Sequence, residues 1–196
     1  MTILRVAGLD PSLNNWGAVI GNLDVATSSV ELAYRLLVET TSSKHKTVRK
    51  NSDDLSRARH ISSRVHQFIQ SADLIFVELP VGSQSARAMA SYGICMGILS
   101  TINKPLIQVM PAEVKFAATG NKNATKNAMI AWAYEKYPDF DWFTKNTPEG
   151  VGLLNKNEHI ADAIGSIYAG LQTDQDSQAK VFLTRRNENG NHVKAE

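Results

Sequence analysis

Two short apolar runs, far apart in the chain, each end in a carboxylate. Residues 3–9 lead into Asp10, and residues 74–77 lead into Glu78. Apolar runs of this length are typical of buried strands. A charge at the end of such a strand is costly unless water or a partner stabilises it. The two runs therefore predict neighbouring strands that bring two acids to one edge of a sheet.

The last helical segment supplies two further polar side chains. His159 and Asp162 stand three residues apart within residues 158–171, so both project from one face of the predicted helix. Clustered carboxylates raise one another's pKa unless a cation neutralises them, and oxygen-rich ligand sets suit Mg²⁺ or Mn²⁺. Taken singly, each residue is explained as well by a turn, a strand end or a solvated pair. Together with Asp10 and Glu78, they favour a metal site.

The remaining patterns predict an α/β fold with a five-stranded mixed sheet flanked by helices. Strands are expected over residues 3–9, 17–21, 30–38, 74–78 and 105–109. Helices are expected from a cap at Ser52 or Asp53 to Ile69, from Ser83 or Ser85 to Ile102, and over residues 111–118, 124–137 and 158–171. Residues 1–172 form the predicted domain and residues 173–196 a polar tail. Residues 138–157 are expected to be irregular.

Charge and cysteine content restrict the setting of the protein. The net charge is only +2, but residues 44–64 hold seven Lys or Arg against Asp53 and Asp54. A solvated loop and helix face explains such a run more often than a binding patch does. The single cysteine, Cys95, excludes an internal disulfide, as is usual in a reducing cytosol. With no signal-peptide pattern and no membrane-length apolar run, we expect a cytoplasmic protein with no membrane partner.

Four segments, in this order, resemble the RuvC family of Holliday-junction resolvases within the ribonuclease-H-like superfamily. They are GLDPSLNNWG, FVELP, QVMPAEVKFAATGNKNATKNAM and EHIADAIGSIYAGL. The resemblance spans residues 4–171. One departure is that family members often carry an aromatic residue soon after the second acid, where this chain has Leu79, Pro80 and Val81.

The resemblance implies a structure-selective endodeoxyribonuclease that resolves four-way DNA junctions with paired symmetric nicks. Its metal and catalytic positions are taken here by Asp10, Glu78, His159 and Asp162, and its flanking basic positions by Lys115 and Lys126. It also implies two Mg²⁺ or Mn²⁺ ions in each site, and a homodimer formed through the helix at residues 85–102. That helix carries small residues at Ala86, Ala90, Gly93 and Gly97.

Other assignments remain open at this point. A ribonuclease-H-like nuclease acting on other branched DNA, on RNA or on hybrids has the same acids, and a non-catalytic junction-binding protein has the same fold. Lys115 and Lys126 are explained equally well as surface lysines. Glu158 lies about 100° around the helix from His159, which makes it a weaker ligand candidate. An actin-like ATPase is excluded by size, because 196 residues cannot form its two domains.

Overall fold

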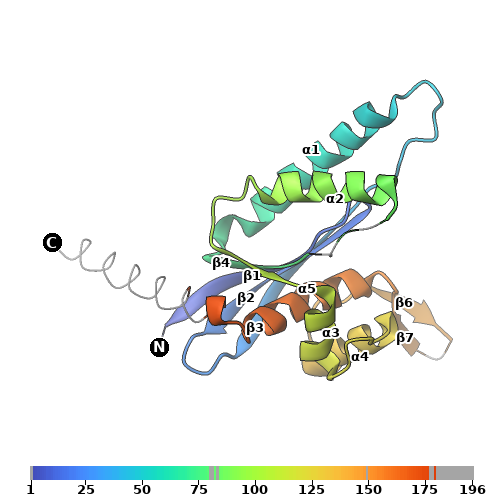
Figure 1. Ribbon diagram of the computed structural model, residues 1–196. Helices are drawn as coiled ribbons and strands as arrows, with labels where there is room; N and C mark the ends of the chain where they lie inside the picture. Colours follow the sequence, from blue (N-terminus) through green and yellow to red (C-terminus); the bar gives the residue numbers. More distant parts are fainter. Residues whose placement is uncertain (1, 80–81, 83, 149, 177–178, 180–196) are drawn as a thin grey trace.

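A five-stranded mixed sheet, with strand order β3-β2-β1-β4-β5, forms the centre of the molecule (Figure 1). The computed structural model describes residues 2–79, 82, 84–148, 150–176 and 179. The strands are β1 (Ile3–Asp10), β2 (Asn15–Asp24), β3 (Val30–Glu39), β4 (Leu74–Glu78) and β5 (Leu106–Val109). The predicted fold class is confirmed. Because β1 runs parallel to β4 and antiparallel to β2, the carboxyl ends of β1, β3, β4 and β5 meet at one edge, called here the C-terminal edge.

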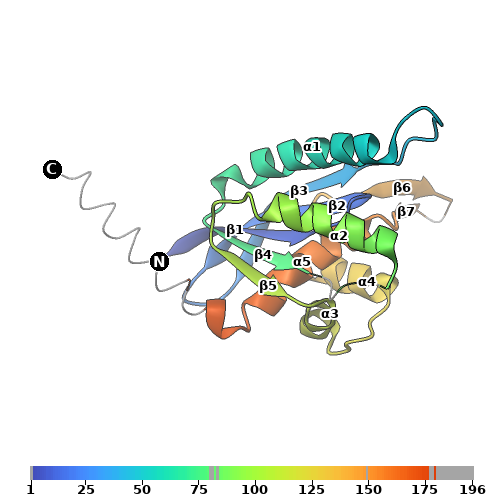
Figure 2. The same cartoon turned by 45° about the horizontal axis from the view of Figure 1, so that its top comes forward.

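Helices cover both faces of this sheet (Figure 2). One face carries α1 (Lys50–Phe68), the short 3₁₀ helix η1 (Ile69–Ser71) and α2 (Ala86–Leu99); the other carries α3 (Pro111–Thr119), α4 (Lys126–Lys136) and α5 (Asn157–Gly170). Each face has its own hydrophobic core. The amino ends of α1, α2 and α5 lie towards the C-terminal edge, at the right of Figure 1.

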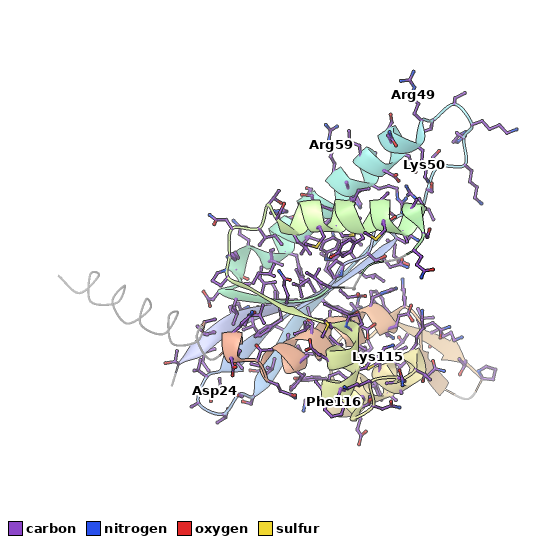
Figure 3. All side chains as sticks on the ribbon, in the orientation of Figure 1. Asp24, Arg49, Lys50, Arg59, Lys115 and Phe116 are labelled. Atoms are coloured by element: carbon purple, nitrogen blue, oxygen red, sulfur yellow. The ribbon has the colours of Figure 1, made fainter. Side chains whose placement is uncertain are left out.

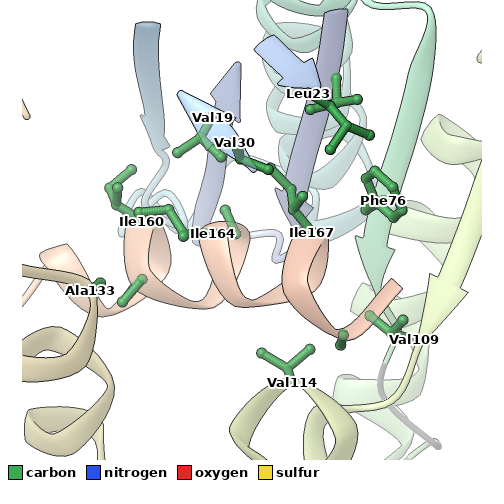
Figure 4. Close-up of a cluster of buried hydrophobic side chains, with 14 of the residues drawn as sticks. Val19, Leu23, Val30, Phe76, Val109, Val114, Ala133, Ile160, Ile164 and Ile167 are labelled. Atoms are coloured by element: carbon green, nitrogen blue, oxygen red, sulfur yellow. The ribbon is translucent and has the colours of Figure 1, made fainter. Parts of the chain in front are cut away.

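Helix α5 lies directly on the sheet. Ile160, Ile164 and Ile167 are fully buried, at the spacing that places them on one helical face, and they share a core with Val19 and Phe76 (Figure 4). Glycines allow this close approach.

A Cβ atom added at Gly17 would collide with the carbonyl oxygen of His159, and one added at Gly8 would collide with that of Ala163. This contact between backbones therefore fixes where α5 crosses β1 and β2. It also fixes the positions of His159 and Asp162, which lie in the first turns of α5.

The start of α1 differs from the prediction. The helix begins at Lys50 rather than after a cap at Ser52 or Asp53. The Asp53 carboxylate instead accepts hydrogen bonds from the Ser42 hydroxyl (2.9 Å) and the Ser43 backbone N–H (3.2 Å), so it fastens the preceding loop. Leu55, in the second turn of α1, is 51% exposed, whereas Ile61 and Val65 of the same helix are fully buried.

Residues 138–157 are not irregular throughout, and that prediction was wrong. Strands β6 (Thr144–Thr147) and β7 (Gly150–Leu153) form an antiparallel hairpin beside the amino end of α5. Its residues show no alternation of apolar and polar side chains. Its base is held by Asn157, which is fully buried and exchanges hydrogen bonds of 3.0 and 2.8 Å with the backbone of Phe143.

The end of the chain lies partly outside the described residues. The predicted polar tail includes residues 177–178 and 180–196, of which the structure gives no description. Of its described residues, Asp176 is buried and Ala179 packs against the core. No helix within the described part of the chain has both the length and the hydropathy needed to span a bilayer.

Candidate active site

The two predicted strand-end acids lie side by side. Leu9 pairs with Val77 in the parallel register of β1 and β4, so Asp10 and Glu78 are the next residues on neighbouring strands. Leu9 and Val77 both point into the core under α1 and α2. Because side chains alternate along a strand, the two acids point to the opposite face, towards α5.

The first turns of α5 complete the cluster. The Nδ1 atom of His159 lies 2.8 Å from a carboxylate oxygen of Asp10. Asp162 is one turn further along the helix, close enough for its charge to act on Glu78. The structure therefore brings together all four residues that the sequence suggested as metal ligands.

Burial and mutual repulsion make these carboxyl groups hard to ionise together. Burial, reinforced by the charges of Asp10 and Asp162, raises the pKa of Glu78 to about 9. Burial and the charge of Asp10 raise the pKa of Asp162 to about 7. In the metal-free protein, Glu78 therefore stays protonated at neutral pH.

The hydrogen bond between Asp10 and His159 affects the pKa of both side chains. Burial raises the pKa of Asp10, although the hydrogen bond to His159 opposes this effect. Burial alone would lower the pKa of His159, but the hydrogen bond to Asp10 and the nearby charges outweigh it, so this pKa is raised. Because both pKa values are raised, the pair retains a proton to higher pH than free Asp and His side chains would.

The two predicted lysines differ in their surroundings. Lys115 on α3 acts electrostatically on both Glu78 and Asp162. Lys126 instead forms an ion pair with Glu158 at 2.8 Å. Glu158 also lies 3.4 Å from Nε2 of His159, so His159 stands between two carboxylates. Sequence analysis ranked Glu158 as a weaker ligand candidate because it lies about 100° around the helix from His159. It nevertheless reaches the site, because the two ring nitrogens of His159 contact different carboxylates.

The donor set suits a hard divalent cation, because Mg²⁺ and Mn²⁺ prefer carboxylate oxygens and Mn²⁺ also accepts imidazole. Within the described residues, however, no three His, Cys, Asp or Glu side chains are already arranged to hold a metal ion. The hydrogen bond between Asp10 and His159 occupies one of the donor oxygens. A cation would replace that bond and relieve the repulsion among the acids.

A buried arginine shapes the turn that follows Asp10. Arg57 donates hydrogen bonds to the carbonyl of Leu13 (3.0 Å) and the hydroxyl of Thr40 (2.9 Å), and it also contacts Asn14. Asp54 lies 3.5 Å from its guanidinium. Arg57 belongs to the basic run of residues 44–64, for which a solvated face is the commoner explanation, but its side chain is buried and used internally. Its spacing of three residues from Asp54 was the available sequence signal.

Other basic residues of the same run are exposed. Arg49 and Lys50, at the amino end of α1, extend from the body of the molecule above the C-terminal edge, and Lys115 lies below the sheet (Figure 3). Exposed cationic side chains therefore lie on both sides of the sheet.

Solved structures match this arrangement of elements. RuvC from Thermus thermophilus in complex with a Holliday junction substrate aligns with a TM-score of 0.61 and 18% identity, over 85% of this chain and 92% of that one. The chain has the RuvC fold. A second structure of Thermus thermophilus RuvC gives a TM-score of 0.59 at 16% identity, over 86% and 92% of the two chains.

The RuvC fold also extends to a viral protein. Fowlpox virus resolvase, solved in complex with Holliday junction DNA, aligns with a TM-score of 0.50 and 16% identity, over 92% of this chain and 99% of that one. No protein-family model and no curated protein matches the sequence. At these identities the structural similarity establishes the fold, and the function must be argued from the site.

Proposed function

We propose that this protein is a metal-dependent endodeoxyribonuclease that resolves four-way DNA junctions. The observation that carries the proposal is the convergence of Asp10, Glu78 and Asp162 with His159 at the C-terminal edge of a RuvC fold. Binding sites in α/β sheets form at this edge. Two of the similar structures were solved with Holliday junction DNA, which favours branched DNA as the substrate.

The three carboxylates are the residues that would hold divalent ions, two in each site, with His159 as a further ligand. Bound ions of this kind activate water as a nucleophile and stabilise the leaving 3′-oxygen. Lys115, which faces Glu78 and Asp162, would meet the negative charge of the scissile phosphate. Lys126 would do so after exchanging Glu158 for the phosphate. His159, which bonds Asp10 in the absence of metal, would serve either as that further ligand or as the group that accepts or returns a proton beside the phosphate, but not as both at once.

Paired cutting requires two sites, and we propose that α2 forms the dimer contact. Cys95, Ile98 and Leu99 are its buried residues, whereas Gly93 and Gly97 are exposed. A Cβ atom added at either glycine meets nothing within 4 Å, so these small residues are not needed for packing inside one chain. They leave a flat surface on which a second helix can approach closely.

Charge on this surface should separate the subunits. A Gly97→Glu variant should fold normally but be monomeric by light scattering, and it should lose coordinated cutting of the two strands. Ser56→Glu, at an exposed position of α1, provides the matched control. A wild-type protein that is already monomeric at tens of micromolar contradicts the dimer.

The proposed activity is tested with a labelled four-way junction and a linear duplex of the same sequence. With Mg²⁺, we expect nicks at symmetric positions in strands of like polarity, and products that a ligase seals directly. Without Mg²⁺, binding should remain and cutting should stop. Equal cutting of the linear duplex, or asymmetric nicks that cannot be ligated, would rule out junction resolution. Binding without any cutting would favour a junction-binding protein.

A further inference from the structure

A pocket opens at the C-terminal edge on the opposite face of the sheet from the acid cluster. Its volume is about 540 Å³, within the range of sites that hold small organic ligands. It lies between the turn after β1 and the amino-terminal halves of α1 and α2. Neither the predicted metal ligands nor the exposed glycine surface of α2 contributes to its lining.

The pocket adjoins the candidate active site. Pro11, which lines it, directly follows Asp10, and Leu79, which also lines it, directly follows Glu78. Consecutive Cα atoms are only about 3.8 Å apart. Cys95 on the pocket wall is close enough to Asp10 for the carboxylate charge to act on its thiol. A strand whose phosphate lies at the acids therefore needs to pass only over the β1–β2 turn to place its next nucleotide at this pocket.

The wall has the chemical groups that a nucleotide requires. Leu13, Leu79 and the ring of Tyr92 provide apolar and aromatic surface for a flat base. Ser91 and Asn14 carry polar groups. Aromatic side chains that stack on unpaired bases are the usual means of binding single-stranded nucleic acid.

The cationic side of the pocket is held in place by Asp54. Arg87 binds both carboxylate oxygens of Asp54, one of them at 2.7 Å, and Arg57 lies 3.5 Å from the same carboxylate. Lys50 also lines the pocket, and its side chain is half exposed. The two arginines form a fixed wall, whereas Lys50, which contacts Ser42 and lies 3.8 Å from a carboxylate oxygen of Asp53, would exchange these partners for a phosphate at the rim.

We propose that this pocket receives the base of an unstacked nucleotide next to the scissile phosphate. The inference rests on the proposed nuclease function and extends it to selectivity. A nucleotide leaves the stack most easily where it is mismatched or already unpaired, as at a branch point. The pocket thus couples cutting to the presence of a branch and to the identity of one base beside it.

Filling the pocket tests this inference. Ala88 is exposed and lines the pocket, so Ala88→Trp places a ring there without disturbing the core. Ser56→Trp, on the exposed face of α1, is the matched control. Tyr92→Ala removes the aromatic wall without adding bulk and serves as the second variant. Thermal melts establish that each protein is folded.

The first readout is cutting of junctions with an abasic site at successive positions around the mapped nick. For wild type and Ser56→Trp, one position should reduce the rate at least about tenfold, the effect of losing roughly 1.4 kcal/mol of binding. Ala88→Trp and Tyr92→Ala should cut the intact junction slowly. An abasic site at that position should reduce their cutting rates little further. Equal sensitivity of all four proteins overturns the inference.

The second readout does not depend on cutting. With 2-aminopurine placed in turn at each position around the branch point and no metal, wild type and Ser56→Trp should raise its fluorescence on binding at one position, because the base leaves the stack there. Ala88→Trp should bind the junction without this rise. If wild type fails to cut any junction, the nuclease proposal fails while this measurement still tests the pocket. Unchanged fluorescence with wild type overturns the pocket assignment alone.

Discussion

The two faces of the sheet hold their buried acids in opposite electrostatic states. On the α5 face, burial and neighbouring carboxylates raise the pKa of Glu78 to about 9 and that of Asp162 to about 7. On the α1–α2 face, the hydrogen bonds from Arg87 hold the pKa of Asp54 below its usual value. None of the ion pairs among the described residues includes Glu78 or Asp162. Asp54 is paired with Arg57 and Arg87 of its own chain, whereas Glu78 and Asp162 need a cation from solution to form an ion pair.

The largest expected difference between the faces is in catalysis. Asp10→Asn and Glu78→Gln should each reduce junction cutting by at least about a thousandfold, equivalent to roughly 4 kcal/mol of barrier. Their junction affinity in chelator should stay within about tenfold of wild type. Asp54→Asn, measured in parallel, should lose far less activity. Near-wild-type cutting by either α5-face variant would remove that residue from the catalytic set.

The next difference is in stability. Asp54→Ala leaves Arg57 buried without its carboxylate, and breaking such pairs costs about 3–5 kcal/mol. For a chain of this size, the melting temperature should fall by roughly 6–20 °C. Asp139→Ala, at an exposed position, should change it by no more than about 2 °C. A melting temperature that is equal in Asp54→Ala and wild type would show that this ion pair is solvated.

Metal binding should depend on pH on the α5 face. Because Glu78 keeps its proton up to about pH 9, a bound divalent ion must displace that proton at neutral pH. Apparent affinity for Mg²⁺ should therefore rise about tenfold for each pH unit between 7 and 9, and more steeply below, where Asp162 is also protonated. Calorimetry in buffers of different ionisation enthalpy counts the released protons. Metal binding without proton release at pH 7.5 would contradict the raised pKa.

The smallest expected effect is a gain of stability. The folded-state pKa of Glu78 lies above its ordinary value of 4.5, so metal-free wild type should lose stability as pH rises from 4.5 towards about 9. Glu78→Gln avoids that ionisation and should melt about 2–4 °C higher in chelator near pH 8.5, with the gap closing near pH 5. Added Mg²⁺ should reverse the order. A melting temperature of Glu78→Gln below that of wild type in chelator near pH 8.5 would contradict the expected destabilisation by the ionised Glu78 carboxylate.

The α5-face cluster was predictable from sequence because its signals are local. The runs before Asp10 and Glu78 identify strands, and the three-residue interval between His159 and Asp162 places them on one side of a helix. Only the order of the elements is needed to bring these positions to one edge. Local patterns of apolar and polar residues likewise predict the five strands of the sheet and the helices that cover its two faces.

The features that sequence analysis missed depend on distant contacts. Arg57 lies in a run of basic residues typical of a solvated surface, yet it binds the carbonyl of Leu13, 44 positions earlier in the chain. The β6–β7 hairpin lacks strand periodicity, and its base depends on the contacts of Asn157 with Phe143. The ring of Phe143 also lies 3.5 Å from the guanidinium of Arg35, on β3. No local pattern reveals these partners.

The contact of α5 with Gly8 and Gly17 has a mechanical consequence. Where side chains separate a helix from a sheet, rotamer changes absorb small displacements. Here the carbonyl groups of His159 and Ala163 abut the strand backbones, so that tolerance is absent. Strands and helix must move as one body, and the spacing between the acids of the sheet and those of the helix is set by main-chain atoms. Adjustment to a substrate of variable shape must therefore occur outside this body.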